Sequence, residues 1–215
     1  MWLETNLRLI LQNNAPLAAR LRAISADNIW EIHRSDSGSF TIAKRISDHT
    51  ARFLHSKIDP GKEAADWVSH QVTPEKHAYI MGMGLGYHII EFVRKHREIE
   101  SLHIIEADEG LFRISLEVND LSEVLSHRGL HLLLGQESDA IAQSLHHQYQ
   151  FFSYHIYLPV TSLYEEYYNA VIRELNRRLF ELRLNQEGNN SPQKPLIFPD
   201  CWYTLRFSCI MILAA

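Results

Sequence analysis

Cysteine is nearly absent from this chain of 215 residues. The two that occur, Cys201 and Cys209, both lie close to the C-terminus, so the body of the protein has no disulfide framework, as is typical of a reducing compartment. The N-terminus lacks the basic flank and the apolar segment of a signal peptide. No apolar run approaches the ~20 residues that a bilayer-spanning helix needs. We therefore expect a cytoplasmic protein that does not enter a membrane.

An excess of positive charge is missing as well. The formal net charge is −5 and the isoelectric point is about 6.2, so no basic field is available to hold nucleic acid through its phosphates. The thirteen histidines are scattered, and His146 and His147 are adjacent, which prevents them from sharing one helix face. The charge argues against a nucleic-acid partner, and because neither a Cys-x-x-Cys spacing nor a carboxylate-rich loop occurs, we also expect no metal site.

What the chain does contain is a glycine-rich turn between a strand and a helix. A short apolar run at 78–81 leads into Gly82-x-Gly84-x-Gly86, and an amphipathic helical pattern follows. A second apolar run at 102–105 ends on Glu106 and Asp108. A strand, a glycine turn, a helix and a strand that ends on acids form the opening unit of a nucleotide-binding α/β fold.

The residue types of this unit suggest how a ligand would be held. Glycine tolerates positive φ and lets a ligand approach the bare backbone. The start of the helix offers free N–H groups and a positive dipole end to an anion. His88, close to that start, is placed either to face a ligand phosphate or to stay half-exposed. Glu106 or Asp108 would accept hydrogen bonds from ribose hydroxyls.

The spacing of the glycines leaves the kind of ligand open. The third glycine of a dinucleotide fingerprint would fall at Tyr87, which argues against NAD or FAD. The triplet is closer to the S-adenosylmethionine loop of methyltransferases, but the acid that usually precedes that loop is replaced here by Ile80. The alternative is that the glycines bind nothing and only turn the chain.

Apolar periodicity predicts the other elements. Two helices are expected between residues 3 and 25 and a β-hairpin at 29–43. A helix is expected from Pro60, with Asp59 as its N-cap. The buried stripe of that helix is predicted to contain Ala64, Trp67, Val68 and Val72. Two further strands and two further helices are predicted at 130–135, 154–159, 139–147 and 161–185.

Because strands and helices alternate, the sequence indicates an α/β fold. We expect a Rossmann-like parallel sheet with helices on both faces, preceded by a small N-terminal helix plus β-hairpin region. The expected domains are this N-terminal region at 1–70, the Rossmann-like domain at 71–185, and a linker with an atypical tail at 186–215. The Gly, Asn, Ser and Pro content after residue 186 is typical of a linker.

Three separated blocks of the chain resemble one protein family. They contain His55, Ser56, Asp59, Pro60, Glu63 and Ala64, then Gly82, Gly84, Leu85, Gly86, Tyr87 and His88, then Ile105, Glu106 and Asp108. Together with a similar segment at 119–122, they resemble the N-terminal part of the motility-associated factor (Maf) family. These are bacterial proteins implicated in transferring nonulosonic acid sugars to flagellin. The resemblance covers residues 3–185.

This resemblance implies a Rossmann-like module that leads a glycosyltransferase. In the family the transfer chemistry is assigned to a following MptE-like central domain, which opens with a glycine-proline-serine block that does not occur here. We therefore expect a glycosyltransferase-associated module without the complete catalytic domain. It would recognise a nucleotide, a nucleotide-sugar or the protein acceptor, flagellin. An S-adenosylmethionine-dependent methyltransferase and a non-enzymatic flagellar assembly module are the alternatives.

The predicted ligand site combines the glycine turn with a loop upstream of it. The predicted ligand-binding residues are Gly82, Gly84, Gly86, His88, Glu106, Asp108, His55, Ser56 and Asp59; no catalytic residue is assigned. The upstream loop has two open roles, because Asp59 as a helix cap needs no ligand, whereas the loop would also suit the mouth of the site. The expected partner is a nucleotide-type small molecule, with a nucleotide-sugar and S-adenosylmethionine as the cofactor candidates.

Overall fold

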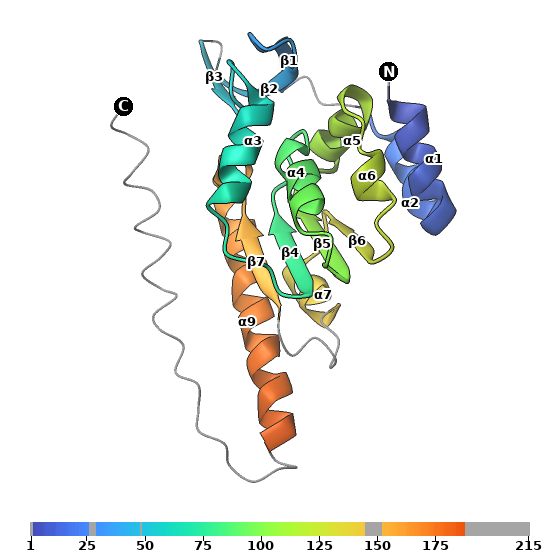
Figure 1. Cartoon of the computed structure of the whole chain (residues 1–215), viewed down its shortest axis with the longest axis vertical. Helices are drawn as coiled ribbons and strands as arrows, with labels where there is room; N and C mark the ends of the chain where they lie inside the picture. Colours follow the sequence, from blue (N-terminus) through green and yellow to red (C-terminus); the bar gives the residue numbers. More distant parts are fainter. Residues whose placement is uncertain (1, 26–28, 48, 145–151, 188–215) are drawn as a thin grey trace.

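The computed structural model describes residues 2–25, 29–47, 49–144 and 152–187 (Figure 1). Within these ranges the chain forms a parallel sheet with helices on both faces and a small antiparallel sheet beyond one end of it. The histidine pair at 146–147 and the expected tail from residue 188 onward lie outside the described residues. None of the helices in these ranges is both long and apolar enough to cross a bilayer.

The central sheet contains β4 (His77–Met81), β5 (Ser101–Glu106), β6 (Leu130–Leu134) and β7 (Ser153–Ile156). Its order is β6-β5-β4-β7, and all neighbouring strands are parallel. The connecting helices are α4 (Tyr87–Lys95), α5 (Glu109–Val118), α6 (Ser122–Leu125) and α7 (Ser138–Gln143). This arrangement confirms the expected α/β fold with a Rossmann-like sheet.

The N-terminal region forms the two helices that its periodicity predicts. α1 (Leu3–Asn13) and α2 (Ala15–Ala23) are separated at Asn14. The Asn14 side chain caps α2 by accepting a hydrogen bond from the amide of Leu17 at 3.0 Å. Pro16 lies in the first turn of α2, where its missing N–H removes no helical hydrogen bond.

α3 (Pro60–Ser69) also begins where the sequence predicts. The carboxylate of Asp59 accepts two hydrogen bonds of 3.0 Å from amides in the first helical turn, and Ala64 and Val68 are buried. The predicted stripe is wrong at Val72, which is 69% exposed. The reason is that the helix ends at residue 69, before the stripe reaches that position.

The antiparallel sheet consists of β1 (Trp30–Arg34), β2 (Phe40–Ser47) and β3 (Thr50–Phe53), in that order. The first two strands are the expected hairpin. The sequence does not predict β3, because its four residues are too few to show an alternating pattern. Ile42 of this sheet packs with Leu111 and other residues of the central domain. This contact places the small sheet beyond the carboxyl ends of β4 and β7 (Figure 1).

Downstream of β7 the chain forms α8 (Leu158–Thr161) and α9 (Glu165–Glu187). The strand predicted at 154–159 is therefore too long, because Pro159 lies in the first turn of α8 instead of ending the strand. The single helix expected from 161 begins four residues later, and it continues through Glu187, two residues into the expected linker.

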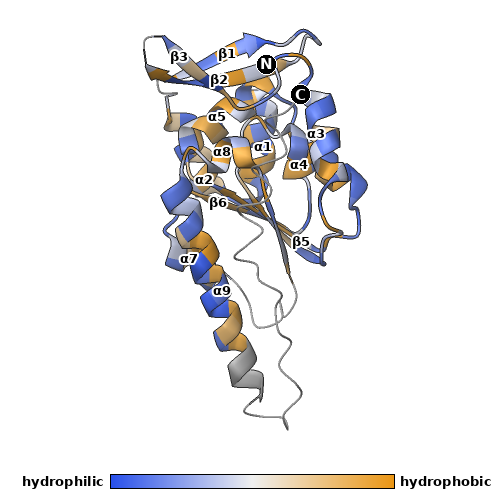
Figure 2. Ribbon diagram, turned by 90° about the vertical axis from the view of Figure 1, so that its left-hand side faces the viewer, coloured by the Kyte–Doolittle hydropathy of each residue, from blue (hydrophilic) through white to orange (hydrophobic). Residues whose placement is uncertain are grey.

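The central strands are buried on both faces, as expected for parallel strands between two helical layers. Along β4, Ala78 and Ile80 face a core that they share with α1, α2, α4, α5 and α6. Tyr79 and Met81 face the opposite core, which contains α7 and α9. Figure 2 shows the apolar residues gathered between these layers and the lower part of α9 extending beyond the sheet.

Candidate functional site

The glycine turn lies where the order of the central sheet reverses. From β4 the chain moves outward to β5 and β6, and then returns to place β7 on the other side of β4. In open α/β sheets, ligands bind in the crevice outside the carboxyl ends of the strands at such a switch point. Here the turn at 82–86 lies at the switch point, and the segment at 157–161 packs against it. The predicted glycine turn therefore occupies the position at which this class of fold binds ligands.

All three glycines of the turn have positive φ, at +85° for Gly82, +52° for Gly84 and +85° for Gly86. They also lie against protein atoms. A Cβ atom would come within 3.0 Å of Val160 Cβ at Gly82, and within 2.6 Å of His55 Nε2 at Gly84. Both the backbone conformation and the close approach of neighbouring side chains thus require glycine here.

Several main-chain donors of the turn are bonded within the protein. The amide of Gly82 donates to the carbonyl of Ile105 at 2.9 Å. The amide of Met83 donates to Glu106 Oε2 at 2.7 Å, and the amide of Leu85 donates to His55 Nε2 at 2.8 Å. These are groups of the kind that a bound anion would use in a glycine-rich turn.

His55 reaches the turn from the loop between β3 and α3, and its side chain is buried. Because Nε2 accepts from the Leu85 amide, the ring proton lies on Nδ1. Nδ1 is 2.9 Å from the hydroxyl of Tyr157, which in turn donates to the carbonyl of Leu54 at 2.8 Å. The imidazole therefore joins the loop, the glycine turn and the segment after β7.

His88 lies on the first turn of α4 and is fully buried. Its Nε2 is 3.0 Å from the carbonyl of Gly82, and its ring stacks on Tyr157 with centroids 3.9 Å apart. Burial and the neighbouring imidazole of His55 hold the pKa of His88 well below its ordinary value. The neutral ring donates from Nε2, and no hydrogen-bond partner within the described residues reaches Nδ1.

Glu106, at the end of β5, is fully buried. Its two carboxylate oxygens accept hydrogen bonds from the amides of Met83, at 2.7 Å, and Asp108, at 3.0 Å. Burial raises the pKa of this carboxyl to about 7, although both amides act in the opposite direction. Glu106 is thus a support beneath the glycine turn.

Asp108 follows β5 and joins several elements. One carboxylate oxygen caps α5 by accepting from the amide of Leu111 at 2.9 Å. The other accepts from Trp30 Nε1 at 3.3 Å and from the hydroxyl of Tyr164 at 2.6 Å. The hydroxyl of Tyr164 also accepts from Lys44 Nζ at 3.1 Å. The carboxylate therefore ties the antiparallel sheet to the switch point.

Ser56 and Asp59 lie at the start of α3 and form its cap. The hydroxyl of Ser56 accepts from the amides of Ile58 and Asp59, both at 3.1 Å. The amide of Ser56 donates to Glu63 at 2.9 Å. These two side chains organise the loop that carries His55, while their role in ligand binding stays a prediction.

The structure thus brings His55, His88 and the glycine turn together around Tyr157, with Glu106 below the turn. Sequence reasoning did not select Tyr157, which is buried and has a pKa raised well above its ordinary value by that burial. Its position directly after the strand beside β4 is the signal that would have identified it. Asn119, whose side-chain amide donates to the carbonyl of Leu85 at 2.7 Å, was singled out only as part of a family-like segment.

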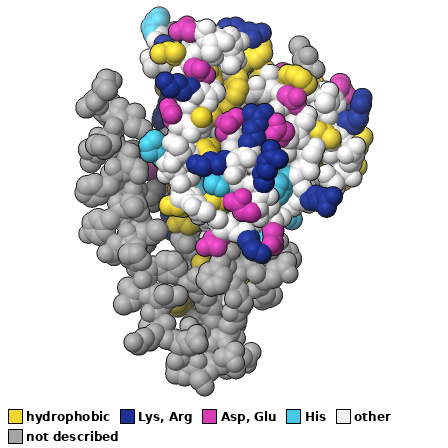
Figure 3. Space-filling view, in the orientation of Figure 1, with side chains coloured by type: hydrophobic (Ala, Val, Ile, Leu, Met, Phe, Trp, Pro, Cys, Tyr) yellow, Lys and Arg dark blue, Asp and Glu magenta, His cyan; other side chains and the backbone are white. Residues whose placement is uncertain are grey.

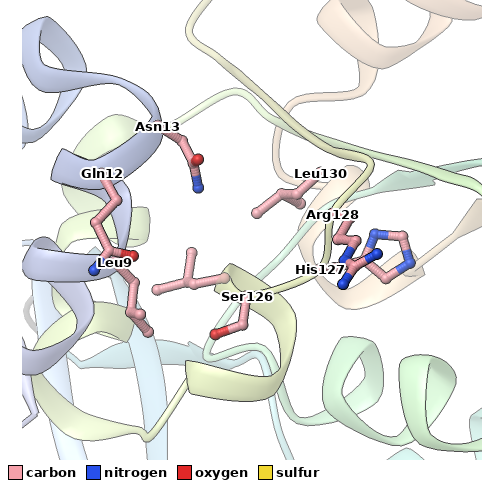
Figure 4. Close-up of a pocket in the computed structure, with 8 residues that line it drawn as sticks. Leu9, Gln12, Asn13, Ser126, His127, Arg128 and Leu130 are labelled. Carbon is pink, nitrogen blue, oxygen red and sulfur yellow. The ribbon is translucent and has the colours of Figure 1, made fainter.

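A separate hollow of about 490 Å³ lies between α1 and the connection from α6 to β6 (Figure 4). Gln12, Asn13 and Arg128 are among its lining residues, and none of the predicted site residues contributes to it. Basic and acidic side chains are intermixed on the face shown in Figure 3. Arg94 of α4 pairs with Glu91 at 2.7 Å and with Glu123 at 2.5 Å. Among the described residues, no three metal-ligating side chains converge on one point.

Fold and site define a Rossmann-like module with a glycine turn at the switch point of its sheet. The family model of the glycosyltransferase Maf N-terminal domain matches residues 28–185, which include both sheets. The chain therefore belongs to the Maf N-terminal domain family. A comparison with curated protein sequences gives no match.

Among solved structures, the chain is similar to a Maf glycosyltransferase from Magnetospirillum magneticum AMB-1, with 15% identity and a TM-score of 0.55. The alignment covers 80% of this chain and 35% of that protein, so this chain spans about a third of its length. Weaker matches are a spermidine synthase in complex with the transition-state analogue AdoDATO and the spermidine synthase of Thermotoga maritima. Their TM-scores are 0.42 and 0.39, each at 12% identity over 71% of this chain and 61% of the other.

Proposed function

We propose that this chain recognises the flagellin acceptor in a Maf-type glycosyltransferase, and that its glycine turn is an internal junction rather than the site of the sugar nucleotide. One observation carries the assignment of the turn: the amides of Gly82, Met83 and Leu85 already donate to acceptors within the protein. A nucleotide that bound to these three amides would have to displace those acceptors. Each buried polar group left without a partner costs about 1–3 kcal/mol.

Acceptor recognition is supported by family membership and by the surface of the antiparallel sheet. On this sheet the guanidinium of Arg34 lies 3.7 Å from the ring centre of Phe40. Lys57, in the loop after β3, places its ammonium 5.0 Å from the ring centre of Phe53. Aromatic and arginine side chains are enriched in protein–protein interfaces. We assign flagellin to this surface.

Nucleotide or S-adenosylmethionine binding at the turn is the second candidate, and the position of the turn at the switch point favours it. In that case His55 would have to leave the Leu85 amide, and the loop at 54–59 would have to move with it. The contact of His55 Nδ1 with Tyr157, at 2.9 Å, would break in the same step.

Binding of purified flagellin to the immobilised chain, measured by biolayer interferometry, tests the acceptor role. Lys57→Glu should weaken this binding by about tenfold, which corresponds to about 1.4 kcal/mol. The control is Arg173→Glu, which reverses another exposed charge on the distant helix α9 and should leave the affinity unchanged. Absence of flagellin binding, or equal effects of the two substitutions, would contradict the proposal.

A thermal-shift screen tests the assignment of the turn separately. We expect no shift with S-adenosylmethionine, S-adenosylhomocysteine, NAD, or CMP- and UDP-linked sugars. A ligand at a hundred times its Kd would add about 2.7 kcal/mol and would be visible. A shift with the CMP- or UDP-linked sugars would place the sugar nucleotide in this module. A shift with the adenosyl compounds alone would favour the methyltransferase alternative.

A further inference from the structure

β1 is an edge strand of the antiparallel sheet. It pairs with β2 on one side, and no other strand within the described residues pairs with its outer side. The amide of Arg45 donates to the carbonyl of Ile29, and the amide of Ser35 donates to the carbonyl of Ser39, both at 2.8 Å. These two bonds show which residues of the strand face β2.

In an antiparallel pair, every second residue of a strand bonds to the neighbouring strand through its main-chain N–H and C=O groups. The main-chain groups of the residues in between face away from that strand. Positions 29, 31, 33 and 35 bond inward. Trp30, Ile32 and Arg34 therefore direct their N–H and C=O groups toward the open edge. Such a row of main-chain groups is a template for another strand.

The middle of this edge is apolar and accessible. Ile32 is 43% exposed, whereas Ile42, directly opposite it on β2, is fully buried. The edge therefore extends beyond the part of the sheet that the core covers. Proteins usually protect an open edge with a charge, a proline or a bulge at its centre, and β1 has isoleucine at that position.

The sequence of β1, Trp30-Glu31-Ile32-His33-Arg34, is complementary to itself when it is read in the opposite direction. If two copies pair about Ile32, that residue lies opposite its own equivalent and forms an apolar pair. Glu31 then lies opposite His33, an acid opposite a base. Both the Ile32 pair and the Glu31–His33 pair are favourable cross-strand combinations.

The bonding pattern fits the same register. A pairing centred on Ile32 matches Trp30 with Arg34 and Ile32 with Ile32, and these are the residues with outward main-chain groups. The side chains between them are also accessible, since those of Glu31 and His33 are 29% and 42% exposed.

We propose that β1 pairs in antiparallel fashion with β1 of a second copy of this chain, about a twofold axis at Ile32. The two three-stranded sheets would then form one continuous sheet. This is an isologous contact, in which the same residues serve on both sides. A single strand pair buries less than the ~1,200–2,000 Å² of a stable interface, so the dimer forms in a concentration-dependent equilibrium.

Sedimentation equilibrium over a concentration series tests the association. Ile32→Lys sets two like charges opposite each other across the axis and should weaken dimerisation at least about tenfold, the equivalent of 1.4 kcal/mol. The control is Ile46→Lys, which makes the same change at a 57% exposed position on β2 and should leave the equilibrium unchanged. Circular dichroism checks that both variants are folded.

Cross-linking tests the register without relying on loss of function. Bonded antiparallel residues have Cα atoms about 5.5 Å apart, which is within the range that a disulfide spans. In a background with Cys201→Ser and Cys209→Ser, Ile32→Cys should form a disulfide-linked dimer under mild oxidation, and Ile46→Cys should not. Equal rates for the two variants, a chain that stays monomeric at every concentration, or pairing of β1 only with a strand of another protein would overturn the proposal.

Discussion

At the scale of single residues, the group with the most unusual environment is Glu106. It is fully buried, and no cationic side chain of the described residues pairs with its carboxylate, which instead accepts two main-chain N–H bonds. Loss of hydration raises the pKa of this carboxyl to about 7, and the two amides offset only part of that effect. Its charge therefore changes close to neutral pH, directly beneath the glycine turn.

This pKa predicts how stability depends on pH. The ordinary pKa of a glutamate carboxyl is 4.5, and that of Glu106 in the folded chain is about 7. Between these two pH values, Glu106 has lost its proton in the unfolded chain but still holds it in the folded chain. The free energy of unfolding therefore falls by about 3 kcal/mol as pH rises through this window, and the contribution is constant above it. Below pH 4.5 Glu106 is protonated in both the folded and the unfolded state, so its ionisation does not lower the free energy of unfolding.

Urea unfolding of the wild type and of Glu106→Gln, measured at several pH values, checks this expectation. The difference between the two free energies should change between pH 4.5 and 7 and then level off, because the contributions of the other carboxyls cancel in the difference. Parallel curves across the window would show that Glu106 has the same pKa in the folded and unfolded states.

At the scale of elements, the glycine turn is held from three directions. β5 supplies Glu106, the loop before α3 supplies His55, and α8 supplies Val160. The turn itself is formed by local backbone conformation, but its surroundings come from segments distant in sequence. The cost of adding a side chain should therefore depend on packing as well as on φ.

Gly84→Ala and Gly38→Ala separate these two contributions. Both glycines have positive φ, and each substitution incurs about 1–2 kcal/mol of backbone strain. A Cβ at Gly38 meets nothing within 4 Å, whereas at Gly84 it lies 2.6 Å from His55 Nε2. We expect Gly84→Ala to cost about 1–3 kcal/mol more than Gly38→Ala in urea unfolding. Equal costs would mean that His55 can move away from the turn freely.

At the scale of the whole molecule, Asp108 connects the two sheets. It accepts from Trp30 in β1 and from Tyr164 ahead of α9, while its other oxygen caps α5. Because side-chain contacts and one apolar cluster attach the antiparallel sheet, without main-chain pairing to the central strands, it should open more readily than the central sheet, whose strands are covered on both faces.

Asp108→Asn tests this connection. The amide oxygen can still cap α5, but the NH₂ group that replaces the second oxygen cannot accept from Trp30 Nε1. Native-state hydrogen exchange should show opening of β2 made easier by about 1–3 kcal/mol, with little change in β4 and β5. Asp59→Asn, which also retains its cap, is the control. A uniform loss of protection in all strands would contradict a local connection.

Sequence reasoning reached most of the fold because local physical rules specify most of the elements. The apolar periods of α1 and α2, the Asp59-Pro60 start of α3 and the glycine turn after β4 each depend on residues adjacent in the chain. It failed where the local signal is short or ambiguous. β3 has four residues, and Pro159 suits the end of a strand and the first turn of a helix equally well.

By itself, the sequence determined that this protein has alternating strands and helices, a glycine turn after the first central strand, and acids at the end of the next. Only the tertiary structure decided what surrounds that turn. His55 reaches the Leu85 amide from 30 residues away, and Tyr157 reaches His55 from 102 residues away. No local pattern encodes such contacts, because they depend on how the two sheets pack together and not on the conformational preferences of neighbouring residues.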